Sequence, residues 1–168
     1  RTFDLMQFGP LPIIAAMHGA VIGGGLELAT VAHIRVAEPD VIYQLPEGRR
    51  GIFVGGGASV RVARIIGAGR MTELMLTGRK LGADDGEALG LSHYLVGKGE
   101  ALAKAMELGN EIAGNAPLAN LMILHAIPRI ADMSMTDGLF TESIAGALTQ
   151  TSADARAGMQ AFLEKRGI

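Results

Sequence analysis

The chain has 168 residues, 49% hydrophobic and 19% charged, and this combination excludes a disordered protein. Its length fits one domain with a packed core. A net charge of −2 offers no basic surface for nucleic acid or for an anionic membrane, and no apolar run reaches the roughly 18 residues of a membrane span. The absence of cysteine excludes disulfides, thiolate zinc sites and cysteine nucleophiles.

The first third of the chain predicts short strands around one helix. The first strand candidate is apolar and bounded by Pro10 and by the pair His18-Gly19, and the helix candidate lacks breakers. A strand, a glycine turn, a helix and another strand form a βαβ-like unit, which is usually buried on both faces. The predicted strands are 11–17, 34–37 and 41–44, and the predicted helix is 26–32.

Helices dominate the prediction from about residue 58 onward, because apolar residues recur there at helical spacing. The predicted helices are 58–66, 71–76, 83–89, 100–112, 118–130, 136–147 and 153–165. Two or three short strands make a marginal sheet by themselves. We therefore expect either that a partner completes the sheet or that the sequence lacks an N-terminal portion.

The 24 glycines are clustered, and one cluster leads to a candidate site. Gly23-Gly24-Gly25-Leu26-Glu27 lies between a predicted strand and a predicted helix, where backbone N–H groups at a helix start can bind an oxyanion. Glu47 follows a predicted strand twenty residues later, on the turn Leu45-Pro46-Glu47-Gly48. Two carboxylates from two elements could share one water and act as acid and base.

Structural explanations compete with this chemistry. Glu27 near a helix start is favourable for the helix dipole alone, by about 0.3–1 kcal/mol. Glu47 beside Arg49 and Arg50 could be an ion-paired surface residue. Gly23-x-Gly25 imitates a dinucleotide fingerprint, but Leu28 stands where that fingerprint needs a small residue, and we reject it.

Other candidate residues give no site. The histidines, at 18, 33, 93 and 125, show no metal-binding spacing, so we expect packed or capping residues and no metal. No Gly-x-Ser-x-Gly nucleophile motif occurs. Three arginines near glycines are expected on a solvated helix face: Arg61, Arg64 and Arg70.

The segment from Pro12 to Gly57 resembles the crotonase superfamily of enoyl-CoA hydratases and isomerases. The pairing of Gly-Gly-Gly-x-Glu with Pro-Glu at this spacing is specific to that family. The likeness continues through Ile65–Val96 and reaches AFLEKRG at Ala161–Gly167, so it covers nearly the whole chain.

The resemblance implies roles for particular residues. Glu27 and Glu47 match the two catalytic carboxylates, and the Gly24 N–H matches one arm of the oxyanion hole. The implied reaction is syn addition of water to an enoyl-CoA thioester, with coenzyme A as part of the substrate and no separate cofactor. Three further positions match substrate or CoA binding: Gly23, Phe162 and Lys165.

The resemblance also implies an architecture. We expect an α/β fold with a crotonase-like ββα spiral core, of which residues 1–100 form the C-terminal part, and a helical oligomerisation region over 101–168. That region would form a trimer or a dimer of trimers. No signal peptide is evident at Arg1–Gln7, and we expect a cytoplasmic protein, with the mitochondrial matrix as an open alternative.

The sequence departs from the family at several places. His33 stands where the family often has Asp, and Val54-Gly55 where it often has Pro-Gly. The family's N-terminal third, with further strands and the other oxyanion N–H, is not in this sequence. The alternatives to a hydratase are a double-bond isomerase using Glu47, another crotonase-type acyl-CoA lyase or hydrolase, and a non-catalytic acyl-CoA-binding protein.

Overall fold

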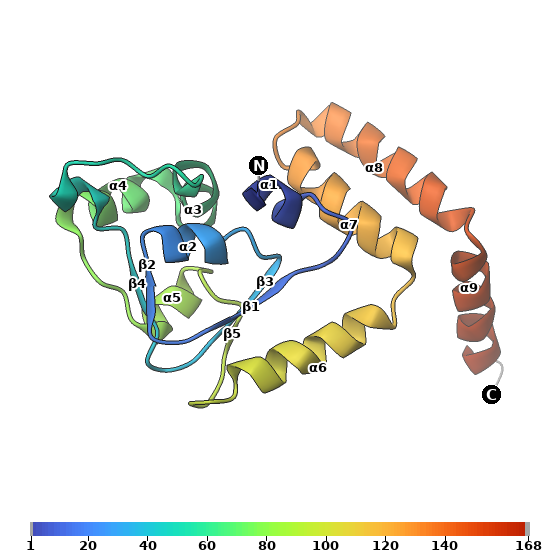
Figure 1. Ribbon diagram of the computed structural model, residues 1–168. Coiled ribbons are helices and arrows are strands. Elements are labelled where there is room, and N and C mark those ends of the chain that lie inside the picture. Colours follow the sequence, from blue (N-terminus) through green and yellow to red (C-terminus); the bar gives the residue numbers. More distant parts are fainter. Residues whose placement is uncertain (1, 167–168) are drawn as a thin grey trace. The chain divides into compact units, whose positions relative to one another are not determined.

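The computed structural model describes residues 2–166, and side chains as far as residue 164. The chain forms two compact units, which are described separately (Figure 1). The first unit contains the residues up to Gly9 together with Ile13–Asn110. The second contains Pro10–Pro12 and the residues from Glu111 onward.

Two small parallel sheets lie in the first unit. One has the order β1-β3-β5 and the other pairs β2 with β4. Ile14 lies opposite Ile34, and Ala20 lies opposite Ile42, so these strands pair with strands 20 or 22 residues further along the chain. The strands within the described residues are β1 (Ile14–Met17), β2 (Ala20–Ile22), β3 (Ile34–Ala37), β4 (Ile42–Gln44) and β5 (Tyr94–Leu95).

This repeat explains the spacing of the two carboxylates. The chain runs through β1, β2 and the helix α2 (Gly24–Ala29), and then through β3, β4 and the short 3-10 helix η1 (Glu47–Arg50). Because β2 and β4 are parallel neighbours, the segments that follow them leave the sheet at the same edge. Glu27 in α2 and Glu47 in η1 therefore emerge side by side, although twenty residues separate them.

Helices cover the strands of the first unit and supply its core (Figure 1). Apolar residues of α3, α4 and α5 pack with Leu26, Tyr43 and Leu45 into one buried cluster, α6 packs against Val36 in a smaller cluster, and α1 contributes no buried residue. The buried Glu38 accepts a hydrogen bond from the Ala101 N–H, 3.2 Å, at the start of α6. These helices are α1 (Thr2–Gln7), α3 (Ala58–Ile66), α4 (Ala68–Thr77), α5 (Ala83–Ala88) and α6 (Ala101–Ala113).

A buried arginine joins the strands to the turn after α5. The Arg35 guanidinium donates to the carbonyls of Ala32, Gly90 and Leu91 at 2.8–3.1 Å. The Arg35 N–H donates to His93 Nδ1, 3.0 Å, and burial together with the Arg35 charge lowers the pKa of His93. His93 thus bonds to the backbone of β3, although the residue itself is exposed at the surface.

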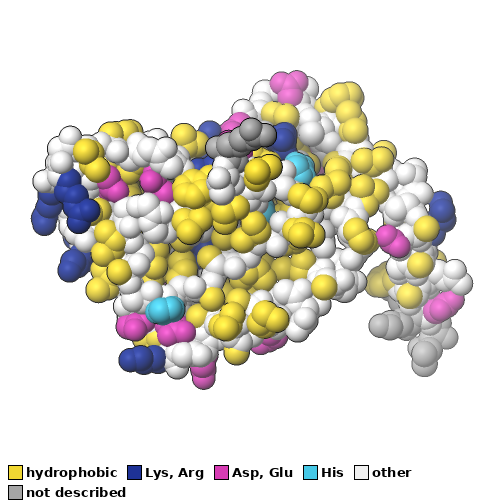
Figure 2. Space-filling view, viewed as in Figure 1, with side chains coloured by type: hydrophobic (Ala, Val, Ile, Leu, Met, Phe, Trp, Pro, Cys, Tyr) yellow, Lys and Arg dark blue, Asp and Glu magenta, His cyan; other side chains and the backbone are white. Residues whose placement is uncertain are grey.

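The second unit consists of the helices α7 (Pro117–Ile130), α8 (Met135–Gln150) and α9 (Ala153–Arg166). Ser134 begins α8 by accepting the Asp137 N–H, 3.2 Å. Large apolar side chains of these helices lie at the surface, and Figure 2 shows hydrophobic side chains exposed on the face that it presents. They include Ile123, Ile127, Met135, Leu139, Phe140, Ile144, Leu148 and Met159.

Several sequence predictions need correction. The expectation of two or three strands was wrong, since residues 2–166 contain five. The sequence analysis missed β2 and β5, which have three and two residues and are too short to show an alternating pattern of apolar residues. The first strand is 14–17 rather than 11–17. The helix predicted at 26–32 is α2, which runs from Gly24 to Ala29 and so begins inside the glycine cluster, because tertiary packing overrides weak helix propensity there. The helix predicted at 58–66 is confirmed.

Candidate active site

The glycine cluster and both candidate carboxylates line one pocket of about 320 Å³ in the first unit. The tertiary structure thus brings together Gly23, Gly24, Glu27 and Glu47. The full lining is Ile22, Gly23, Gly24, Glu27, Pro46, Glu47, Arg50, Ile52, Phe53, Val54 and Gly55. The other two candidates lie in α9 of the second unit: Phe162 is 51% exposed, and the Lys165 side chain is outside the described part of the structure.

Gly23 occupies a position that requires glycine. Its φ is +54°, a backbone conformation that side-chain-bearing residues rarely adopt. A Cβ on Gly23 would lie 2.7 Å from Glu47 Oε1, so the missing side chain makes room for that carboxylate.

Gly24 begins α2 directly beside this carboxylate. The first helical hydrogen bond runs from the Glu27 N–H to the Gly23 carbonyl, 3.0 Å. The Gly24 N–H therefore has no acceptor within its own helix. Gly24 also lines the pocket, and a helix-start N–H is a donor of the kind that binds an oxyanion.

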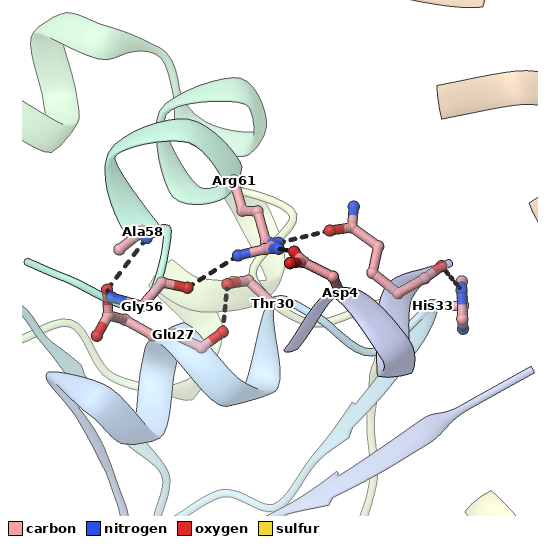
Figure 3. A network of polar contacts seen from close by, with 8 residues as sticks. Asp4, Glu27, Thr30, His33, Gly56, Ala58 and Arg61 are labelled. Carbon is pink, nitrogen blue, oxygen red and sulfur yellow. Dashed lines mark hydrogen bonds and ion pairs between the residues drawn. The ribbon is translucent and has the colours of Figure 1, made fainter. Parts of the chain in front are cut away.

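The Glu27 carboxylate is buried and held by the backbone of a distant loop. Its Oε1 accepts the N–H groups of Gly56, 2.6 Å, and Ala58, 3.2 Å (Figure 3). A Cβ on Gly56 would lie 2.8 Å from Glu27 Oε2, so the loop packs closely against both oxygens. The side chain does more than complement the helix dipole, because it anchors the turn before α3.

Glu47 is buried at the start of η1, and its Oε2 has no hydrogen-bond partner among the described residues. The alternative of an ion-paired surface residue is wrong, because Glu47 is only 7% exposed and makes no ion pair with Arg49 or Arg50 in the described structure. Instead, Arg49 packs against Gly78 and Arg50 lines the pocket. A buried carboxylate oxygen without a partner is costly unless a ligand group pairs with it.

The sequence analysis missed two features of this region. It assigned no role to Ile52 and Phe53, which supply an exposed apolar wall of the pocket. It also expected Arg61 on a solvated face, and this was wrong, since the Arg61 side chain is only 14% exposed and bonds to its surroundings. Arg64 and Arg70 are exposed, as predicted.

Among residues 2–166, no group of three or more His, Asp or Glu side chains is arranged to hold a metal ion. No described helix is long and apolar enough to cross a membrane.

The small parallel sheets and the C-terminal helices define a class, the α/β proteins of the crotonase fold. A crystal structure of a candidate enoyl-CoA hydratase from Rhodopseudomonas palustris superposes with a TM-score of 0.96 at 51% identity, over 99% of this chain and 65% of that one. The family model for enoyl-CoA hydratase/isomerase matches residues 1–168, and the chain belongs to that family.

Curated relatives agree with this assignment. A candidate enoyl-CoA hydratase/isomerase of Bacillus subtilis is 36% identical over 99% of this chain and 64% of its own length. The short-chain-enoyl-CoA hydratase of Clostridium acetobutylicum is 33% identical over 100% of this chain and 64% of its own length. The relatives include both bacterial and mitochondrial proteins. The chain spans less than two thirds of the length of these relatives.

Proposed function

We propose that the protein containing this chain is an enoyl-CoA hydratase, which adds water syn across the 2,3 double bond of an acyl-CoA thioester. The observation that carries the proposal is the pair of buried carboxylates at one pocket, with Glu47 Oε2 unpartnered among the described residues. A buried, unpaired carboxylate oxygen facing a pocket is costly for stability and suited to proton transfer.

Each group takes one part of the reaction. The Gly24 N–H polarises the thioester carbonyl and stabilises the enolate that forms. Glu27 orients a water and takes its proton while the water oxygen bonds to C3, and Glu47 delivers a proton to C2.

The pocket wall supports an apolar acyl group. Ile22, Ile52, Phe53 and Val54 line it beside the two carboxylates. Such a wall would bury part of an acyl chain, with about 25 cal/mol gained per Å² of apolar surface removed from water.

A second candidate is an enoyl-CoA double-bond isomerase that uses Glu47 alone. The observation in its favour is that Glu27 Oε1 is already occupied by two backbone N–H groups, which gives Glu27 a structural reason to be buried. An isomerase needs one carboxylate to move a proton between two carbons, and Glu47 has the unpaired oxygen.

The helices of region 101–168 are proposed to join copies of the chain into a trimer or a dimer of trimers. The exposed apolar side chains of α7, α8 and α9 support this proposal, because a large exposed apolar surface usually marks an interface. Phe162 and Lys165 are proposed to contact the CoA of a neighbouring subunit. Light scattering on the purified protein tests the assembly, and a monomer at micromolar concentration would contradict it.

The decisive experiment follows crotonyl-CoA hydration by the full-length gene product, beside Glu27→Gln and Glu47→Gln. We expect each variant to lose about 10²–10⁴-fold in kcat, the usual contribution of one acid–base group. Turnover of a 3-enoyl-CoA that survives Glu27→Gln and is lost in Glu47→Gln would favour the isomerase. A folded wild type that binds CoA esters and converts neither substrate would refute both activities.

A further inference from the structure

Arg61 connects the candidate site to the helix α1 at the start of the described chain (Figure 3). We propose that Arg61 is a positioning residue for Glu27: it fixes the segment 56–58 whose N–H groups bind that carboxylate. The inference rests on the proposed function, because the effect of Arg61 on turnover passes through Glu27. Arg61 is not among the residues that line the pocket.

The contact that matters is made to the Gly56 carbonyl. Arg61 Nη1 donates to this oxygen, 2.9 Å. In the chain, the Gly56 carbonyl lies between the two N–H groups, of Gly56 and Ala58, that bind Glu27 Oε1. The peptide that Arg61 holds therefore lies between the two donors, and its release would loosen the segment 56–58 that binds Glu27.

The other contacts of Arg61 hold it in place. Its Nε donates to Gln7 Oε1, 2.6 Å, and its Nη2 lies 3.7 Å from Asp4 Oδ1. A planar guanidinium can serve these partners at once, whereas a lysine ammonium on a flexible stem cannot reproduce the same fork. Bonds from a charged donor are also roughly twice as strong as bonds between neutral groups.

The helix α1 is itself anchored, so it provides a fixed support for Arg61. His33 Nδ1 accepts the Ile13 N–H, 3.0 Å, which leaves Nε2 to donate to the Gln7 carbonyl, 3.0 Å. The Phe3 ring lies against Gly56, where a Cβ would be 2.7 Å from it. The histidine at position 33 thus ties α1 to the strand β3, and through Gln7 and Arg61 to the loop that holds Glu27.

Loss of Arg61 should therefore affect the chemical step more than substrate binding. If Glu27 moves by about 1 Å, water is held away from the reacting carbon, and such a displacement can cost about a hundredfold in rate. The apolar side chains of the pocket wall and the Gly24 N–H are untouched, so KM should change little.

The test compares Arg61→Ala, Arg61→Lys and the control Arg64→Ala in the full-length gene product. Arg64 lies on the same helix and is exposed, which makes it a matched removal of one guanidinium. With crotonyl-CoA we expect kcat to fall about 10–100-fold in Arg61→Ala. We expect a smaller loss in Arg61→Lys, KM within about twofold of wild type for both, and no effect of Arg64→Ala. Arg61→Lys carries the test if Arg61→Ala does not fold.

A second readout does not depend on activity. Hydrogen exchange at the amides of Gly56 and Ala58 should accelerate in the Arg61 variants and stay unchanged in Arg64→Ala. Equal kcat and equal loop exchange in the Arg61 and Arg64 variants would overturn the proposal, as would a rise in KM with unchanged kcat. If the wild type turns over no enoyl-CoA, the proposed function fails, while the exchange comparison still decides whether Arg61 fixes the loop.

Discussion

Replacing Gly23 with alanine tests whether the carboxylates and the glycine cluster are packed as described. Two costs add at this position. The φ of +54° is unfavourable for any residue with a Cβ, by about 1–3 kcal/mol. The new Cβ would also lie 2.7 Å from Glu47 Oε1, so the carboxylate has to move. We therefore expect the free energy of unfolding to fall by at least about 1–3 kcal/mol.

Gly25→Ala is the matched control two residues further along. Gly25 lies in α2, and a Cβ there would be 3.9 Å from the Ala20 carbonyl oxygen, an ordinary contact. Alanine in a helix is favoured over glycine by about 0.5–1 kcal/mol, so this variant should be as stable as wild type or more so. Urea unfolding of both variants measures the difference, and equal stability would refute the packing of Gly23 against Glu47.

Three further predictions concern the scaffold of the first unit. Gly86→Ala should lower the free energy of unfolding by about 1–3 kcal/mol because its Cβ would enter the Tyr43 ring, whereas Gly82→Ala, with open space, should not. Glu38→Ala should cost about 1 kcal/mol in urea unfolding by removing the acceptor at the start of α6, and an unchanged midpoint would contradict this. The pKa of His93 in the folded protein lies below its unfolded value of about 6.5, so folding favours the neutral imidazole. The contribution of His93 to the free energy of unfolding is therefore complete above pH 6.5 and is lost as the pH falls from there through the folded pKa. Urea unfolding at a series of pH values should therefore show a weaker pH dependence in His93→Gln than in wild type.

The resemblance in the sequence predicted the α/β fold of the family, and both the family and the fold are confirmed. Helical spacing of apolar residues also located the helix at 58–66. The roles of Glu27, Glu47 and Gly24 stay predictions.

The short elements escaped the sequence analysis for a physical reason. A strand of two or three residues, such as β5 or β2, is stabilised by its neighbours in the sheet rather than by its own side-chain pattern. The helix α1 has only six residues, none of them buried, so it is too short to show a helical repeat, yet it carries the contacts of Gln7 with Arg61 and His33.

The sequence by itself determined which residue types are available and at what spacing: two glutamates twenty residues apart, each following a strand, with glycines before the first. Only the tertiary structure decided that these glutamates share a pocket, because their proximity depends on β2 and β4 lying parallel and adjacent. The structure also decided the different surroundings of the two carboxylates. Glu27 binds two backbone N–H groups from a loop about thirty residues away, while Glu47 Oε2 finds no partner in the described residues. Contacts over such sequence distances depend on how the chain is packed, which local residue patterns do not encode.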